Sequence, residues 1–345
     1  MLTPRRVREL RGHTAPLQVV AFTPDGRYLL TAGQDRTISL WNPFRPPAGD
    51  ADTGGLLIKQ YRGHGYEVVD VAVAPDNARF VSCGGDKCAL VWDTASGAIA
   101  RKLWGHDARI NCVALNAEAT VLLTASDDRR VRAWDLRASA RAPLQTWAEA
   151  TDNATSVLCA GDTIITGSLD GSVRSYDLRS ARASADALGA PVTSLALSRD
   201  GNCLLAATPS AGGGALTLLE RASGAVLARY ACGHVNALYR TRAAFTSDDA
   251  AVLAPSEDGG LAVYDLVEGA VLARLPAAHR RVLSCVAPHP SPLQASVFAT
   301  CSFDGTAALW CAPGREEALA ACVLAGGSAE ELGLTGGGGE GRERR

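Results

Sequence analysis

Short apolar runs separated by turn residues recur along most of this chain. In the clearest copy, a Gly-His pair at residues 63–64 precedes an apolar run at 68–73 and a Pro-Asp-Asn turn. Two further apolar runs follow, and the second of them closes on Trp92-Asp93. Short strands cut by turn residues at this spacing indicate antiparallel β-sheet. The pattern therefore predicts small sheets whose strands are joined by tight turns.

Three landmark residues show that the pattern is a repeat. An Asp lies 22 residues after a His, and a Trp lies 6 residues after that Asp, in the sets His13, Asp35, Trp41; His64, Asp86, Trp92; and His106, Asp128, Trp134. Three later copies keep the second spacing and end at Tyr176, Tyr264 and Trp310, and a degenerate copy ends at Leu219-Glu220. A repeat of about 40–45 residues, with Gly-His near one end and Trp-Asp at the other, is similar to a WD repeat. We therefore expect an all-β fold, a seven-bladed WD-repeat β-propeller with four-stranded antiparallel blades.

Closure of the ring is predicted to involve the N-terminus. Residues 7–11 precede the first Gly-His pair as residues 58–61 precede the second, so they are expected to form an outer strand. The copy ending at Trp310 has no clear fourth strand. Because an open ring would leave unpaired backbone groups at two edges, we expect the N-terminal strand, residues 7–11, to complete blade seven of a propeller spanning residues 1–312.

Two stretches depart from the repeat. Residues 43–55 are rich in Pro, Gly and Asp, which predicts an inserted surface loop. Residues 313–345 are predicted to be a C-terminal tail. It would contain a short helix at 315–324, with two acidic residues suited to its N-terminal end, followed by a disordered Gly/Glu/Arg-rich segment.

A Ser or Thr four residues before the Asp completes the landmark set in four copies. These sets are His13, Thr31, Asp35 and Trp41; His64, Ser82, Asp86 and Trp92; His106, Thr124, Asp128 and Trp134; and His279, Thr300, Asp304 and Trp310. The indole N–H can donate to the hydroxyl, and the imidazole can join the hydroxyl to the carboxylate. The same residue types also form hydrolase triads. Because the set recurs in separate blades at fixed spacing, we interpret it as structural and predict no enzyme, no cofactor and no metal site. Copies four to six lack complete sets and are expected to be the softer sector of the ring.

Charge and cysteine content narrow the function further. The net charge is −2 and the pI about 6.3, whereas binding to nucleic acid through phosphates needs a basic surface. We therefore expect no direct sequence-specific nucleic-acid binding. The ten cysteines form no C-x-x-C pair and no zinc-ligand spacing, which favours buried thiols in a reducing compartment. With no apolar signal segment and no apolar run of ~18 residues, we expect a soluble intracellular protein and no membrane partner.

A propeller of this kind is expected to bind proteins through loops on the ring face that carries the Asp turns. Aromatic and Arg side chains are the commonest anchors of such contacts. The candidate partner-binding residues are Tyr66, Glu67, Arg109, Asp127, Asn236, Tyr239, Arg280, Arg281 and Phe303. For each of them, an ordinary solvated loop residue is the alternative interpretation.

Several local motifs resemble a particular family. They are Gly63-His64-Gly65-Tyr66-Glu67-Val68, Gly84-Gly85-Asp86-Lys87, Val91-Trp92-Asp93 and the runs 116–121 and 265–270, and they are similar to the mitogen-activated-protein-kinase organizer family. The resemblance implies a seven-bladed scaffold in the cytoplasm and nucleus. It would assemble kinase-cascade components and associate with splicing factors, as a monomeric platform within larger complexes. The 43–55 loop, the Gly-rich insertion at 211–214 and the tail depart from that family.

A second resemblance supports an alternative function. Trp134-Asp135-Leu136-Arg137 resembles the box through which WD proteins dock onto a cullin-RING ubiquitin ligase adaptor, and Tyr176-Asp177-Leu178-Arg179 is a weaker copy. It would make this chain a substrate receptor with Asp135, Arg137 and Arg179 as docking residues. The favoured interpretation is that the Arg caps the turn after the third strand of its blade.

Overall fold

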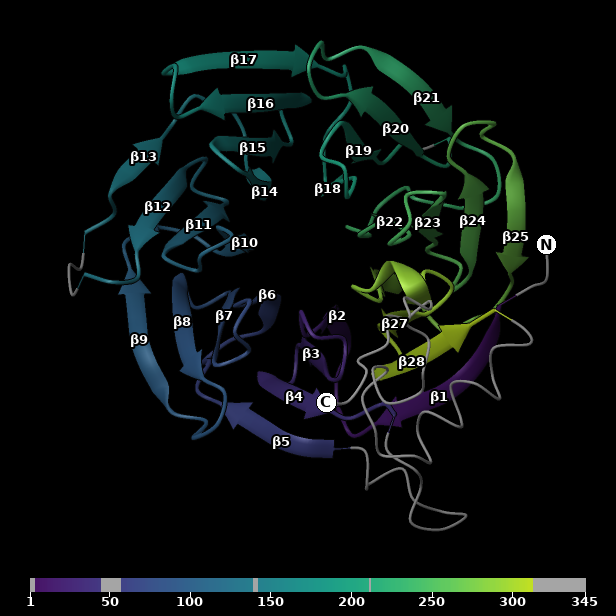
Figure 1. The fold of residues 1–345 in the computed structure, drawn as a ribbon, viewed down its shortest axis with the longest axis horizontal. Coiled ribbons are helices and arrows are strands. Elements are labelled where there is room, and N and C mark those ends of the chain that lie inside the picture. Colours follow the sequence, from purple (N-terminus) through teal and green to yellow (C-terminus); the bar gives the residue numbers. More distant parts are fainter. Residues whose placement is uncertain (1–3, 45–56, 139–141, 211, 313–345) are drawn as a thin grey trace, which may run out of the picture.

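The computed structural model describes residues 4–44, 57–138, 142–210 and 212–312. Within them, seven four-stranded antiparallel sheets stand side by side as the blades of one ring (Figure 1). The predicted all-β, seven-bladed fold is therefore confirmed. Most of the predicted 43–55 loop and the whole 313–345 tail, with its expected helix, lie outside the described residues.

Each blade from one to six runs outward from the centre in chain order, with its first strand innermost (Figure 1). Blade one contains β2 (Leu17–Phe22), β3 (Leu29–Gly33), β4 (Thr37–Trp41) and β5 (Leu57–Arg62); blade two contains β6 (Val68–Val73), β7 (Arg79–Gly84), β8 (Cys88–Asp93) and β9 (Ile99–Trp104); blade three contains β10 (Ile110–Leu115), β11 (Val121–Ser126), β12 (Val131–Asp135) and β13 (Gln145–Trp147). Blade four contains β14 (Ala154–Ala160), β15 (Thr163–Ser168), β16 (Ser172–Asp177) and β17 (Arg182–Ala187); blade five contains β18 (Ser194–Leu197), β19 (Cys203–Thr208), β20 (Ala215–Glu220) and β21 (Val226–Tyr230); blade six contains β22 (Ala244–Phe245), β23 (Ala251–Pro255), β24 (Leu261–Asp265) and β25 (Val271–Leu275).

Blade seven is built from both ends of the described chain. It contains β26 (Leu283–Pro288), β27 (Phe298–Ser302), β28 (Thr306–Cys311) and the N-terminal strand β1 (Arg5–Arg11), with the 3-10 turn η2 (Pro292–Gln294) between β26 and β27. Strand β1 pairs antiparallel with β28, and the two lie along each other at the rim of the ring (Figure 1). Leu10 stands opposite Ala307 and is buried. The N-terminal strand therefore closes the last blade, as predicted, and begins two residues earlier than residue 7.

The strand sequences follow from where each strand lies in its blade. All five residues of β3 are buried because blades pack against both of its faces, so the strand is almost continuously apolar. Outer strands such as β17 are mostly exposed and carry polar residues. Three tryptophans of the repeat, Trp41, Trp92 and Trp134, are among the largest fully buried side chains. Their burial between blades makes the repeat landmark a core residue.

The innermost strands carry a repeated irregularity that shapes the central channel. The register shifts by one residue in β2, β6, β10, β14 and β26. Such a bulge leaves its extra residue outside the ladder. Blade six differs, because its inner strand β22 has only two residues.

Two arginines preceding β22 bind backbone carbonyls at the inner strands of other blades. Arg240 donates to the carbonyl oxygens of Asn111 (2.8 Å), Thr155 (2.5 Å) and Thr193 (2.9 Å), which belong to blades three, four and five. Arg242 donates to the Asp70 carboxylate, to the Val69 carbonyl (3.1 Å) and to the Asn111 carbonyl (3.3 Å). We call these two residues the arginine clasp, since they tie blade six to blades two through five.

Candidate interaction face

In every blade except the fifth, an Asp lies in the turn between the second and third strands, and these turns define what we call the Asp-turn face. In blades one, two, three and seven, His Nδ1 lies 2.6, 2.7, 2.8 and 3.3 Å from the Asp carboxylate. His Nε2 lies 2.8, 2.6, 2.7 and 2.8 Å from the Thr or Ser hydroxyl. The Trp Nε1 donates to the same hydroxyl at 2.7, 2.7, 3.0 and 2.8 Å. These distances fit a chain in which the hydroxyl receives the indole N–H and donates to Nε2, while Nδ1–H donates to the carboxylate.

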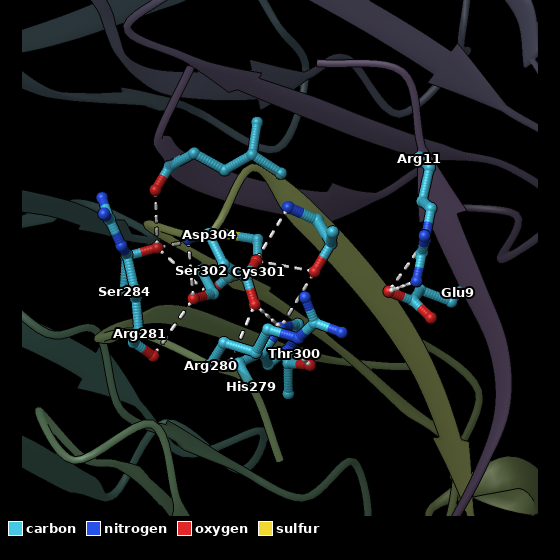
Figure 2. Close-up of polar contacts among 12 residues, drawn as sticks. Glu9, Arg11, His279, Arg280, Arg281, Ser284, Thr300, Cys301, Ser302 and Asp304 are labelled. Atoms are coloured by element: carbon cyan, nitrogen blue, oxygen red, sulfur yellow. Dashed lines mark hydrogen bonds and ion pairs between the residues drawn. The ribbon is translucent and has the colours of Figure 1, made fainter. Parts of the chain in front are cut away.

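Each network also joins two loops of the Asp-turn face. In blade seven the Asp304 carboxylate accepts the backbone N–H of Arg280 (3.1 Å) from one loop (Figure 2). It also accepts the backbone N–H of Thr306 (2.9 Å) from its own turn. In blade three, burial alone would raise the pKa of the Asp128 carboxyl. The hydrogen bonds from His106 and from the backbone N–H groups of Asp107 and Arg130 oppose burial, and that pKa is lowered to about 2. The networks therefore hold the loop geometry of the face.

The networks stand in four separate blades, so they do not form one catalytic constellation. Across the described ranges, no group of three or more His, Cys, Asp or Glu side chains could hold a metal ion. None of the helices in this part of the chain is long and apolar enough to cross a membrane.

Blade four replaces the missing His with an arginine that the sequence pattern did not reveal. Arg174, on the third strand of the blade, donates to both carboxylate oxygens of Asp170 at 2.8 and 3.2 Å. Burial alone would raise the pKa of Asp170, but the Arg174 hydrogen bonds help to lower it to about 2. The one feature of the sequence that could have predicted this ion pair is a basic residue four positions after the turn Asp.

Blade six uses its His in a different way. His234 Nδ1 lies 2.6 Å from the Tyr264 hydroxyl, which donates to the Cys232 carbonyl at 2.5 Å. The turn residue Asp258 is instead paired with Arg274 at 3.2 Å. Because Ala254 occupies the hydroxyl position, His234 Nε2 is buried without a hydrogen-bond partner. Burial lowers the pKa of His234, so the ring stays neutral.

The nine predicted partner-binding residues have different environments. Tyr66 is exposed, whereas Glu67 and Arg109 form an ion pair at 2.8 Å. Asp127 accepts a hydrogen bond from the Asn111 side chain at 2.6 Å. Asn236 is 0% exposed, so the expectation that it contacts a partner is corrected: its backbone pairs with the blade-five turn instead.

The remaining four predicted residues gather over blades six and seven. Tyr239 and Phe303 pack edge to face, with ring centroids 5.5 Å apart. Arg280 and Arg281 are exposed, and the contacts drawn to them in Figure 2 involve their backbone atoms. Beside Tyr239, the structure adds Leu238, which is 84% exposed and which sequence reasoning missed. An isolated apolar residue inside a loop was the only signal for it.

The docking residues of the alternative function lie at turns on the opposite face of the ring. The Asp135 carboxylate accepts the backbone N–H of Arg137 at 2.8 Å, and its contact with the Arg137 side chain is longer, 3.4 Å. Asp177 accepts the backbone N–H of Arg179 in the same way at 2.9 Å. Both turns therefore show the capping geometry, while the two guanidinium groups remain largely exposed.

Seven such blades with repeated His-Asp-Trp networks define a WD-repeat propeller, a class whose members are typically non-catalytic interaction platforms. A model described as WD domain, G-beta repeat, matches residues 4–42, 55–93, 97–135 and 270–311, the four repeats with complete networks. Proteins named WD repeat domain-containing protein 83 from Mus musculus and Homo sapiens are each 40% identical over 290 residues, which is 84% of this chain and 88% of theirs. The protein of that name from Danio rerio is 42% identical over 275 residues, 80% of this chain and 83% of its own. The chain belongs to the WD repeat domain-containing protein 83 family, the mitogen-activated-protein-kinase organizers, as its motifs had indicated.

Proposed function

We propose that this protein is a non-enzymatic scaffold that assembles components of a mitogen-activated-protein-kinase cascade, splicing-complex factors or both. It would work in the cytoplasm and nucleus as a monomeric platform within larger complexes. The observation that carries the proposal is family membership along 84% of the chain, together with the propeller fold. The names of its relatives are not those of enzymes.

The physical support is a rigid ring with differentiated loops. A closed propeller holds its loops in fixed relative positions, so several partners can be kept at set distances from one another. The Asp-turn face exposes aromatic side chains and arginines, the residue types that dominate protein–protein hot spots. The mixture of charges on this face suits proteins better than a polyanion.

The test is affinity purification with mass spectrometry of the wild-type protein and an Arg109/Arg280/Arg281 triple-alanine variant. The matched control is Arg137→Ala/Arg179→Ala on the opposite face. We expect wild type and control to retain kinase-cascade or splicing proteins, and the triple variant to lose part of them. Retention of neither class by the wild-type protein would contradict the proposal.

A ubiquitin-ligase receptor is the second candidate, supported by the exposed guanidinium of Arg137, whose side chain is 71% accessible. Such a receptor would hold the cullin-RING adaptor through Asp135, Arg137 and Arg179. It should therefore co-purify with the adaptor and lose it on Arg137→Ala. Equal recovery of the adaptor with wild type and Arg137→Ala would remove this candidate.

A further inference from the structure

An apolar surface on the Asp-turn face is built by one short loop and one turn. The loop precedes β22 and exposes Leu238 to 84% and Tyr239 to 46%. Phe303, from the turn between β27 and β28, packs its ring against Tyr239. We call Leu238, Tyr239 and Phe303 the apolar knuckle. Large apolar side chains exposed next to one another indicate a contact surface for another molecule.

Hydrogen bonds fix the backbone of the loop that carries Leu238 and Tyr239. One carboxylate oxygen of Glu257 accepts the backbone N–H groups of Ala237 (2.7 Å), Leu238 (2.7 Å) and Tyr239 (2.8 Å). The next residue along the chain is Arg240, whose guanidinium is fixed to three blades in the channel. The exposure of Leu238 is thus imposed by the fold, and little conformational entropy would be lost on binding.

The side-chain charges beside the knuckle that lack a partner are positive. Arg280 and Arg281 lie next to both parts of the knuckle. The Arg281 carbonyl accepts a hydrogen bond from the hydroxyl of Ser302, the residue before Phe303 (3.1 Å). The backbone N–H of His279, the residue before Arg280, donates to the Gly259 carbonyl in the turn that contains Glu257 (2.9 Å). Both arginines are exposed, and within the described ranges neither has a carboxylate partner.

The neighbouring acids are all engaged. Glu257 is bound to the three backbone N–H groups of the loop, Asp258 to Arg274 and the Gly260 N–H, and Asp304 to its network. The unpaired charge beside the knuckle is therefore positive, although the whole chain is slightly acidic.

From this arrangement we infer that the apolar knuckle and the Arg280–Arg281 pair form a docking site for a protein segment carrying a large apolar side chain next to carboxylates. The apolar side chain packs on Leu238 and Tyr239, and the carboxylates pair with the two arginines. The inference rests on the proposed scaffold function and names the chemistry of one class of partner.

A peptide suits this surface better than the other occupants. Single-stranded nucleic acid binds by stacking bases on aromatic faces, whereas the most exposed side chain here is the aliphatic Leu238. A second copy of the chain would bring another positive Arg280–Arg281 pair against the first at a symmetric contact, which is unfavourable.

The test selects displayed random short peptides on the full-length protein and measures the dissociation constant of a synthetic winner. Leu238→Asp places a charge at the knuckle, and Arg280→Glu/Arg281→Glu reverses the rim. The matched control is Val267→Asp, since Val267 is 88% exposed in the β24–β25 turn on the opposite face. All exchanged residues are exposed, so thermal midpoints should stay near wild type.

We expect winners with a large apolar residue flanked by Asp or Glu. Leu238→Asp should raise the dissociation constant about 30-fold. The double reversal should raise it about tenfold and restore binding of a peptide whose acids are replaced by Lys. Selected peptides without acidic residues, or an equal loss of affinity in the Val267→Asp control, would overturn the inference. So would tighter binding of a single-stranded RNA than of any peptide, or self-association of the protein that Leu238→Asp abolishes. If any of those results were found while the wild-type protein still retained kinase-cascade or splicing proteins, the docking site would be wrong and the scaffold function would remain supported.

Discussion

The buried pair of Asp70 and Arg242 makes a sharp prediction about what holds the ring together. Asp70 lies on the inner strand of blade two and is almost fully buried, and Arg242 reaches it from blade six across the channel. Two backbone N–H groups, of Val71 and Val113, also donate to the Asp70 carboxylate at 2.9 Å. Burial alone would lower the pKa of Arg242, but the Asp70 charge raises it above its usual value. The Arg242 guanidinium is therefore charged in the folded protein.

Replacing Arg242 by Met removes the countercharge and leaves Asp70 with two N–H donors. Breaking a buried ion pair by removing one partner costs about 3–5 kcal/mol. We expect about 3 kcal/mol here, because the Arg242 side chain keeps 16% of its surface accessible and the two N–H groups still stabilise the carboxylate. Adding Asp70→Asn to Arg242→Met removes the carboxylate charge that would otherwise be left without a partner. The double variant should therefore lose about 2 kcal/mol less free energy of unfolding than the two single losses added together.

The assay is urea unfolding of wild type, both single variants and the double variant, with free energies from linear extrapolation. Arg240→Met is the matched control, because Arg240 bonds carbonyls in three blades and does not contact Asp70. Its effect should add to that of Asp70→Asn within about 0.5 kcal/mol. The reasoning would be refuted if Arg242→Met lowered the free energy of unfolding by less than about 1 kcal/mol. It would also be refuted if the losses from Arg242→Met and Asp70→Asn simply added in the double variant.

Four further predictions follow from the networks and the closure. The pKa of Asp128 is lowered to about 2, so its contribution to stability is complete above about pH 4 and is lost as the pH falls toward 2. Between pH 7 and 2.5, the urea midpoint of Asp128→Asn should therefore fall less steeply than that of the wild-type protein. Ala254→Ser offers His234 Nε2 a hydroxyl and should stabilise the protein by about 1 kcal/mol, whereas Ala254→Val should destabilise it. Deletion of residues 1–12 removes β1 and exposes the edge of β28, so calorimetry should show loss of the single cooperative transition; an unchanged profile would contradict ring closure as a source of stability. Amides of blades four to six should exchange with deuterium faster than those of blades one to three, and uniform exchange would count against a softer sector.

Local spacing allowed the networks to be predicted but not their replacements. A His, a Thr and an Asp at the offsets of blade one reach one another because the loop before β2, the strand β3 and the β3–β4 turn belong to one blade. Blade six keeps His234 and Asp258, which lie 24 residues apart in the sequence, yet in the structure each has another partner. The loss of the hydroxyl at position 254 and the Tyr in place of Trp changed which contact was available, and spacing alone does not carry that information.

By itself, the sequence of this protein determined the repeat, the number of blades, the strand that closes the ring and the residues of four networks. Each of these depends on short-range periodicity or on the pairing needs of backbone groups at a sheet edge. Only the tertiary structure decided that Arg240 and Arg242 cross the channel, that Asn236 is buried and that Leu238 is exposed. These outcomes depend on residues more than a hundred positions apart or on what covers a loop, and no pattern within one repeat specifies either.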